Sequence, residues 1–202
     1  MNRENSFPKS ITKDQLQELP IKQFEGKKII ISSEEKVRKA IEEISYQKVV
    51  GFDTEAKPTF KKGDYNHISL VQIAIPDKVY LFRIKYTGLL KYMTRLFSSP
   101  KILKIGIGVK DDIRGLQKLK PFEAAGFVDL NEIALQLGFE NTGAKNLSGI
   151  FLGYRISKRQ QLSNWEEFKL TEPQLNYAAT DAFICLEIYQ KMIEHDMIKP
   201  HA

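Results

Sequence analysis

The chain has 202 residues, which is enough for one well-buried domain and short for two. Its residues are 42% hydrophobic and 28% charged, and no apolar run approaches the roughly 20 residues that cross a bilayer. This composition is that of a globular protein and argues against a membrane-spanning one. A formal net charge of +6 favours attraction to polyanions, of which nucleic acid is the commonest in a cell, although solubility alone would also explain it.

The amino terminus and the single cysteine indicate the compartment. The first ten residues contain no apolar stretch that could act as a secretory signal, and Cys185 has no second cysteine for an internal disulfide. We therefore expect an intracellular, reducing environment, the cytoplasm in the first place and the nucleus as the alternative.

Residues 1–27 differ in pattern from the rest of the chain. They combine Pro8, Pro20 and Gly26 with polar residues and lack a sustained hydrophobic period. We interpret them as an N-terminal extension with a short helix over Lys13–Leu19. One domain is expected to follow over residues 28–198.

Within this domain an antiparallel meander is expected first, and strands then alternate with helices. Period and turn signals predict strands over Ile29–Ile31, Val49–Glu55, Ile68–Ile75, Lys78–Ile84, Ile102–Ile107 and Phe127–Leu130. Helices are predicted over residues 33–45, Leu89–Phe97, Val109–Leu119, residues 131–137, Asn146–Leu152 and Thr171–Asp196. Two helix starts have capping-box spacing, Ser32 with Glu35 and Thr171 with Gln174. This order predicts an α/β fold in which one mixed sheet carries helices on both faces.

Two acidic residues close the second predicted strand. The run Val49–Glu55 starts with apolar, β-branched residues, and Asp53 and Glu55 share one face because strand side chains repeat every two residues. Ionised carboxylates held close together repel each other and lose hydration unless a cation neutralises them. The pair therefore favours a divalent metal site.

The long C-terminal helix presents a second candidate pair. Tyr177 and Asp181 are four residues apart and stack on the same helical face, while apolar residues along the helix can bury its other side. Taken alone, each would ordinarily be a packing tyrosine and a solvated aspartate. Asp112, in the predicted helix Val109–Leu119, is a further candidate, and its neighbour Asp111 competes with it.

These residues belong to five sequence blocks that occur in a definite order. The blocks are Val49–Glu55, Leu70–Ala74, Lys104–Gly108 with Asp112, Ser163–Trp165 and Leu170–Ala182. Together they resemble the DEDDy-type 3′-5′ exonucleases of the ribonuclease D and Werner type, over roughly residues 45–195. One departure is Ala56, where Werner-type domains carry a larger residue. The resemblance implies a ribonuclease H-like fold over the domain at residues 28–198, and metal-dependent hydrolysis of DNA or RNA from the 3′ end.

The resemblance also implies a role for each acid. The metal ligands would be Asp53, Glu55, Asp112 and Asp181. They would hold two divalent ions, Mg²⁺ or Mn²⁺, with Asp53 bridging both, and the same alignment prefers Asp112 to Asp111. Oxygen ligands without paired histidine or cysteine favour these ions over structural zinc. Tyr177, with an ordinary pKa near 10, would orient the attacking water rather than act as a strong base.

Basic and aromatic residues near these motifs are candidates for contact with nucleic acid. They are Lys57, Lys61, Lys62, Lys158, Arg159 and Trp165. Solvated loops would explain the cations equally well, and packing against the start of the last helix would explain Trp165. The expected partner is the 3′ end of DNA or RNA, and a helicase or repair partner would be a separate chain.

Two other functions stay open. A catalytically silent relative would bind nucleic acid or a partner protein on the same fold, but such relatives usually lose ligand acids and this chain keeps them. A different metal-dependent phosphoryl hydrolase is the second alternative, including a DEDDh-type enzyme with histidine in place of the tyrosine. Tyr177 and the absence of histidine between Leu170 and Asp181 argue against the DEDDh type.

Overall fold

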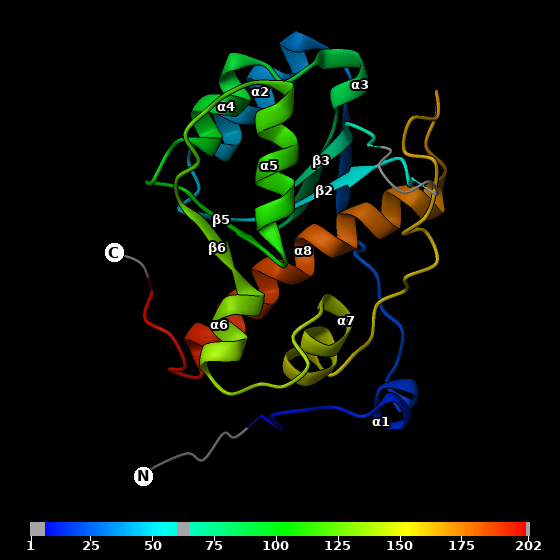
Figure 1. Cartoon of the computed structure of the whole chain (residues 1–202), viewed down its shortest axis with the longest axis vertical. Coiled ribbons are helices and arrows are strands. Elements are labelled where there is room, and N and C mark those ends of the chain that lie inside the picture. Colours follow the sequence, from blue (N-terminus) through cyan, green and yellow to red (C-terminus); the bar gives the residue numbers. More distant parts are fainter. Residues whose placement is uncertain (1–6, 60–64, 201–202) are drawn as a thin grey trace.

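Six strands form one mixed sheet with helices on both faces, in a single domain, as the sequence predicts (Figure 1). The computed structural model describes residues 7–59 and 65–200. The strands are β1 (Lys27–Ile31), β2 (Val49–Ala56), β3 (Ile68–Ile75), β4 (Lys78–Arg83), β5 (Leu103–Gly106) and β6 (Phe127–Asp129). The helices are α1 (Lys13–Glu18), α2 (Glu34–Ile44), α3 (Ile84–Thr87), α4 (Lys91–Phe97), α5 (Val109–Leu119), α6 (Leu130–Gln136), α7 (Ala144–Leu147), the π-helical η1 (Ser148–Leu152) and α8 (Glu172–Glu194).

The strand order is β1-β4-β3-β2-β5-β6. β2, β3 and β4 form the predicted antiparallel meander, while β1 runs parallel to β4, β5 parallel to β2, and β6 parallel to β5. β2 is therefore flanked by an antiparallel and a parallel neighbour. The carboxyl end of β2, where the two predicted acids lie, is thus held in the middle of the sheet.

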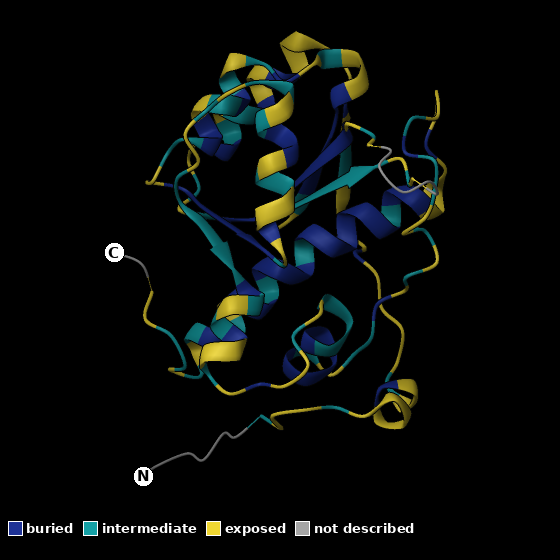
Figure 2. Cartoon of the chain, in the orientation of Figure 1, coloured by how far each residue is buried: buried dark blue, intermediate teal, exposed yellow. Residues whose placement is uncertain are grey.

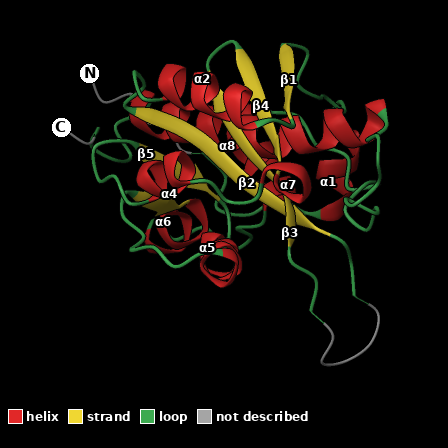
Figure 3. Cartoon of the chain, turned by 90° about the horizontal axis from the view of Figure 1, so that it is seen from above, coloured by secondary structure: helices red, strands yellow, loops and turns green. Residues whose placement is uncertain are grey.

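Different helices cover the two faces of the sheet (Figure 3). α2, α4 and α5 pack on one face, where Phe52 of β2 meets Phe97 of α4 with ring centroids 5.8 Å apart. α8 crosses the other face, together with α6, α7 and η1. Because β2 side chains alternate, a residue next to Phe52 in sequence faces α8.

α8 is the most deeply buried long helix of the described chain (Figure 2). Its start has the predicted capping box, in which the Thr171 side chain accepts from the Gln174 backbone N–H and Gln174 reaches back to the backbone N–H of Thr171. Gly51 allows the helix to approach β2 closely, because a Cβ atom at Gly51 would lie 2.0 Å from the Ala182 carbonyl oxygen. Only a glycine fits at this crossing.

A buried lysine ties β5 to the segment that precedes β6. Lys104 is fully buried, and its ammonium group donates to the carbonyl oxygens of Ser99, Ile102 and Ala125 at 2.7, 2.8 and 2.5 Å. Burial lowers the pKa of Lys104 to about 8. Its three hydrogen bonds give this charge a structural role away from the predicted acids.

The predicted capping box at Ser32 is wrong. The N-cap of α2 is Ser33, and its side chain makes no capping hydrogen bond. The residue three positions after Ser33 is Lys36, which has no acceptor with which to close a box. Glu35 instead pairs with Lys39 at 2.7 Å, one helical turn away.

Other boundaries differ by small amounts. The helix predicted over Asn146–Leu152 is split into α7 and η1, and the single turn α3 after β4 was not predicted. In the segment before β1, Leu16 and Phe24 are buried with 3% and 6% exposure, so this part of the chain packs on the sheet domain. No helix within residues 7–59 and 65–200 is long and apolar enough to cross a membrane.

Candidate active site

Asp53 and Glu55 lie near the end of β2 and face α8. In the register with β3, Asp53 is opposite Gln72 and Glu55 is opposite Leu70. Both acids are partly buried, although the strand before them is almost fully buried. Their common direction follows from the two-residue repeat of a strand, as predicted.

Tyr177 and Asp181 reach the same place from α8. Both are buried, each with 7% exposure, and they lie one helical turn apart. Asp181 directly precedes Ala182, whose carbonyl oxygen lies too close to Gly51 to leave room for a Cβ atom there. The glycine contact that brings α8 onto β2 therefore also brings Asp181 beside Asp53.

Three carboxylates converge at this crossing. Asp53, Glu55 and Asp181 each offer an oxygen within 4.8 Å of those of the other two. Asp181 Oδ1 is buried and has no hydrogen-bond partner among the described residues. A buried carboxylate oxygen without a donor is costly, so the geometry fits a divalent cation held by three oxygen ligands.

The electrostatics of the cluster show the cost of leaving it without a cation. Burial, and after it the neighbouring charges of Asp53 and Asp181, raise the pKa of Glu55 to about 10. Burial, then Asp112 and Asp181, hold the pKa of Asp53 well above its usual value. Burial likewise raises the pKa of Asp181. A bound cation would reverse these shifts, because it favours the ionised form.

Lys158 is the cation that the fold places against this cluster. Its ammonium nitrogen lies 3.5 Å from Asp181 Oδ2 and 5.8 Å from the centroid of the Tyr177 ring. Its charge lowers the pKa of Asp53, Glu55 and Asp181, opposing their burial. Lys158 was predicted as a nucleic-acid contact, and the structure places it inside the acidic site.

Tyr177 is held by packing as well as by its helix. The ring of Trp165 lies 5.9 Å from it at an angle of 37°, and Trp165 itself is fully buried. In this structure Trp165 therefore packs against the start of α8 and is covered from a nucleic-acid base. Burial raises the pKa of the Tyr177 hydroxyl, and the charges of Asp181 and Glu55 raise it further, so the hydroxyl stays protonated.

Asp112 approaches from the opposite face of the sheet. Thr54, which lies between the two acids of β2 and points away from them, donates a hydrogen bond from its hydroxyl to Asp112 Oδ1. Burial raises the pKa of Asp112 to about 7, against the lowering effect of this hydrogen bond. Asp112 lies outside the group of three converging acids but acts electrostatically on Asp53.

Asp112 and Asp111 differ in their surroundings. The Asp111 side chain is 91% exposed and pairs with Arg114 at 3.2 Å, on the solvent side of α5. Asp112 is partly buried and directed to β2. Of the two acids, Asp112 is therefore the one held against the strand that carries Asp53 and Glu55.

The remaining predicted contacts are spread around the site. Lys57 is exposed just after β2, and Arg159 is exposed beside Lys158. Lys61 and Lys62 lie outside the described residues. None of the described cations except Lys158 pairs with a carboxylate of the site.

Two residues near the site were not predicted. Asp129, at the end of β6, accepts from the backbone N–H groups of Gly108 and Val109 at 3.0 and 3.1 Å and so caps α5, which carries Asp112. Gln72 is fully buried opposite Asp53, and its amide has no partner among the described residues. A glutamine inside the otherwise apolar run Leu70–Ile75 is the sequence signal that could have identified it.

Comparison with known proteins identifies the family of the chain. Residues 28–195 match the family model described as 3′-5′ exonuclease. The chain is 28% identical over 200 residues to the exonuclease mut-7 homolog of Aedes aegypti, covering 85% of this chain and 28% of that protein. It is 35% identical over 150 residues to the bifunctional 3′-5′ exonuclease/ATP-dependent helicase WRN of Mus musculus, covering 71% of this chain and 11% of that protein.

The fold is also similar to solved structures. The crystal structure of the Aedes aegypti Nibbler EXO domain superposes with a TM-score of 0.78 at 26% identity, covering 88% of this chain and 92% of that one. The chain thus spans well under two thirds of the curated relatives above, yet nearly all of one solved exonuclease domain. The chain belongs to the 3′-5′ exonuclease family, and it is of the DEDDy type that its sequence blocks indicate.

Proposed function

We propose that this chain is an active 3′-5′ exonuclease that hydrolyses phosphodiester bonds of DNA or RNA with the help of two divalent ions, Mg²⁺ or Mn²⁺. The observation that carries the proposal is the convergence of three carboxylates from β2 and α8 beside a buried tyrosine. The unpartnered Asp181 Oδ1 supports it, because a buried anionic oxygen calls for a cation. Three oxygen ligands suit Mg²⁺ or Mn²⁺.

The residues would share the ions unequally. Asp53, Glu55 and Asp181 would hold one ion, and Asp53 with Asp112 would hold the second, mainly through water in the case of Asp112. When bound, such ions supply the positive charge that activates water and stabilises the leaving 3′ oxygen. The hydrogen bond from Thr54 holds Asp112 against β2, the strand that carries Asp53 and Glu55.

Tyr177 would orient the nucleophilic water. Its pKa is raised by burial and by neighbouring carboxylates, so its hydroxyl is a hydrogen-bond donor rather than a base. Trp165 packs on its ring and limits its rotation. Lys158, freed from Asp181 when the acids hold cations, would reach the phosphate of the substrate.

The test is digestion of 5′-labelled and 3′-labelled oligonucleotides with Mg²⁺, Mn²⁺ or EDTA. We expect a stepwise ladder from the 5′-labelled strand that disappears in EDTA and in the variants Asp53→Asn and Asp181→Asn. Asp111→Asn is the matched control, since this acid is exposed and pairs with Arg114. Binding without cleavage by the wild type would favour a silent module, and full activity of Asp53→Asn would refute the site.

A separate helicase or repair partner is a further part of the proposal. The name of the mouse relative joins an exonuclease with an ATP-dependent helicase, and this chain aligns with 11% of that protein. Added helicase should then accelerate digestion of duplex substrates but leave single strands unchanged. An equal rate on duplex ends with and without helicase would contradict this part.

A further inference from the structure

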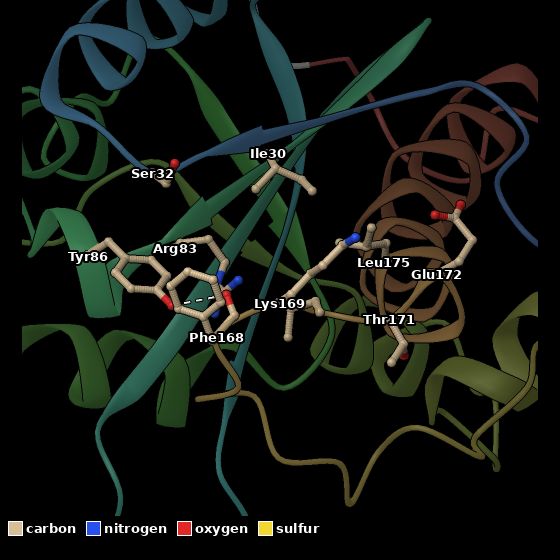
Figure 4. A pocket seen from close by; sticks show the side chains of 10 residues that line it. Ile30, Ser32, Arg83, Tyr86, Phe168, Lys169, Thr171, Glu172 and Leu175 are labelled. Atoms are coloured by element: carbon tan, nitrogen blue, oxygen red, sulfur yellow. Dashed lines mark hydrogen bonds between the residues drawn. The ribbon is translucent and has the colours of Figure 1, made fainter.

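A groove of about 910 Å³ lies at the ends of β1 and β4 and the start of α8 (Figure 4). Its rim carries three exposed apolar side chains, Phe168, Tyr86 and Ile30, with exposures of 86%, 40% and 41%. Exposed aromatic residues that gather at one hollow commonly mark a binding site. None of the proposed metal ligands lines it.

Arg83 forms the floor of this groove. Its side chain is only 3% exposed, and one terminal amino group donates to the carbonyl oxygen of Glu167. Its Nε–H has no hydrogen-bond partner among the described residues. A buried guanidinium group with an unused donor is costly, and an anionic ligand in the groove would supply the missing acceptor.

Aromatic rings stand beside this charge. The Tyr86 and Phe168 rings meet nearly edge to face, with centroids 6.4 Å apart, and the Tyr86 hydroxyl donates to the Phe168 carbonyl oxygen at 3.0 Å. This bond holds the two rings together at the mouth of the groove (Figure 4). Aromatic faces of this kind stack on bases of any sequence.

The charge of the groove also fits a phosphate backbone. Lys169 is exposed on its rim and lines the same groove as the buried Arg83. The acid that lines the groove, Glu172, is paired with Lys28 at 2.6 Å. The groove therefore offers two cations that no carboxylate of the described residues neutralises. Cations combined with aromatic faces are typical of single-strand binding, whereas a purely apolar groove would suit a protein helix.

The register of the sheet links the groove to the acids. Glu55 is opposite Leu70, and Leu70 is opposite Arg83, so the three residues form one row across β2, β3 and β4 on the α8 face. Neighbouring strands lie about 4.8 Å apart, which puts the Arg83 backbone about 10 Å from that of Glu55. Stacked nucleotides rise about 3.4 Å each, so the groove begins about three nucleotides from the acids.

We propose that this groove binds the single-stranded part of the substrate upstream of the nucleotide that is removed, with phosphate at Arg83 and Lys169 and a base on Phe168 and Tyr86. The proposal rests on the exonuclease function proposed above and names a second contact for the same substrate. It predicts that the groove matters for long strands and is irrelevant to a substrate too short to reach it.

The test compares Phe168→Ala and Lys169→Ala with wild type on a dinucleotide and on a twelve-nucleotide single strand. Because Phe168 and Lys169 are exposed, neither change should disturb folding. For Phe168→Ala we expect KM to rise about tenfold on the long strand, with kcat unchanged and no effect on the dinucleotide. Lys169→Ala should reduce the slope of log K against log salt concentration for the long strand by about one, the value for one lost phosphate contact.

Two exposed residues at the opposite end of the sheet provide matched controls. Tyr46 and Lys101 precede the starts of β2 and β5, and Tyr46→Ala and Lys101→Ala should leave both substrates unaffected. An equal change on the dinucleotide and the long strand, or no change on either, would overturn the proposal. Competition by a peptide that is lost in Phe168→Ala would also overturn it, because it would assign the groove to another class of ligand.

A second measurement separates this proposal from the exonuclease function. Binding of a labelled twelve-nucleotide strand in EDTA, followed by fluorescence anisotropy, needs no catalysis. Weaker binding by Phe168→Ala than by Tyr46→Ala would support the groove even if wild type cleaves nothing, an outcome that would defeat only the proposed function. Equal binding by the two variants would reject the groove even if wild type is an active nuclease.

Discussion

At the scale of single residues, the structure changes the interpretation of Lys158 more than that of any other predicted site residue. It lies 3.5 Å from Asp181 Oδ2 and offsets the repulsion among the acids. We predict that Lys158→Met lowers the free energy of unfolding of the metal-free protein by about 1 kcal/mol, a modest value because the side chain is 36% exposed. Chemical unfolding in EDTA measures this loss.

The same substitution should also affect catalysis. We expect kcat/KM of Lys158→Met to fall about tenfold at saturating metal, because the substrate phosphate loses a charge-assisted contact. Lys158→Arg should keep most of the activity, and Arg159→Met is the matched control, since Arg159 is exposed and pairs with no carboxylate of the site. If Arg159→Met lost as much activity as Lys158→Met, the effect would come from general charge and not from position.

At the scale of elements, the site depends on how closely α8 approaches β2. A Cβ atom at Gly51 would lie 2.0 Å from the Ala182 carbonyl oxygen, which is backbone and has little freedom to move. We predict that Gly51→Ala destabilises the fold by about 3 kcal/mol and weakens Mn²⁺ binding, since Asp181 would move away from Asp53. Urea unfolding and a Mn²⁺ titration measure the two effects separately.

Gly143→Ala provides the control for the effect of an added methyl group. Gly143 has an ordinary φ of −71°, and a Cβ atom there would meet nothing within 4 Å. Its replacement should leave metal binding unchanged and stability equal or slightly higher, because alanine restricts the unfolded chain. Comparable destabilisation by the two substitutions would show that the Gly51 contact does not control the crossing.

At the scale of the whole molecule, local patterns were enough to predict the sheet and most of its elements. Strand alternation placed Asp53 and Glu55 on one face, and capping chemistry located the start of α8 at Thr171. Both signals lie within a few residues of sequence. The capping box at Ser32 failed because helix α2 starts one residue later, where Lys36 occupies the position that needs an acceptor.

Contacts between distant segments were beyond such local reasoning. Asp129 caps α5 from β6, and its partners Gly108 and Val109 are about twenty residues earlier in the chain. The ion pair of Lys158 with Asp181 and the fit of Gly51 under α8 likewise depend on tertiary approach. Periodicity identifies the face on which a side chain lies, but what it meets there depends on packing between elements.

Metal binding and proton binding should be coupled through the folding of the whole chain. Burial raises the pKa of Glu55 to about 10 and that of Asp112 to about 7, so the metal-free fold holds protons that the unfolded chain has released at neutral pH. The stabilisation of the fold by these bound protons is fully present below a pH of about 4, where the carboxyl groups of the unfolded chain titrate. It is lost as the pH rises through the pKa values of the folded state. The free energy of unfolding of the metal-free protein should therefore fall from acid to alkaline pH for these groups.

Divalent ions should oppose this loss, because they replace the protons and favour the ionised acids. At about 100 times its Kd a bound ion adds about 2.7 kcal/mol, which corresponds to a rise in Tm of roughly 5–10 °C for a chain of this size. We predict that the rise in Tm caused by a fixed concentration of Mn²⁺ is larger at alkaline than at mildly acidic pH, as calorimetry can measure.

Two variants separate this coupling from metal binding elsewhere. Glu55→Gln removes one ligand and one titrating group, so the rise in Tm with Mn²⁺ should nearly vanish at every pH. Asp111→Asn, which changes an exposed acid of the same helix as Asp112, should behave as wild type. A rise that persists in Glu55→Gln would place the ion outside the cluster. An equal rise in Tm at both pH values would mean that the acids are already ionised in the metal-free fold. Something other than bound protons would then have to offset the repulsion among the converging carboxylates.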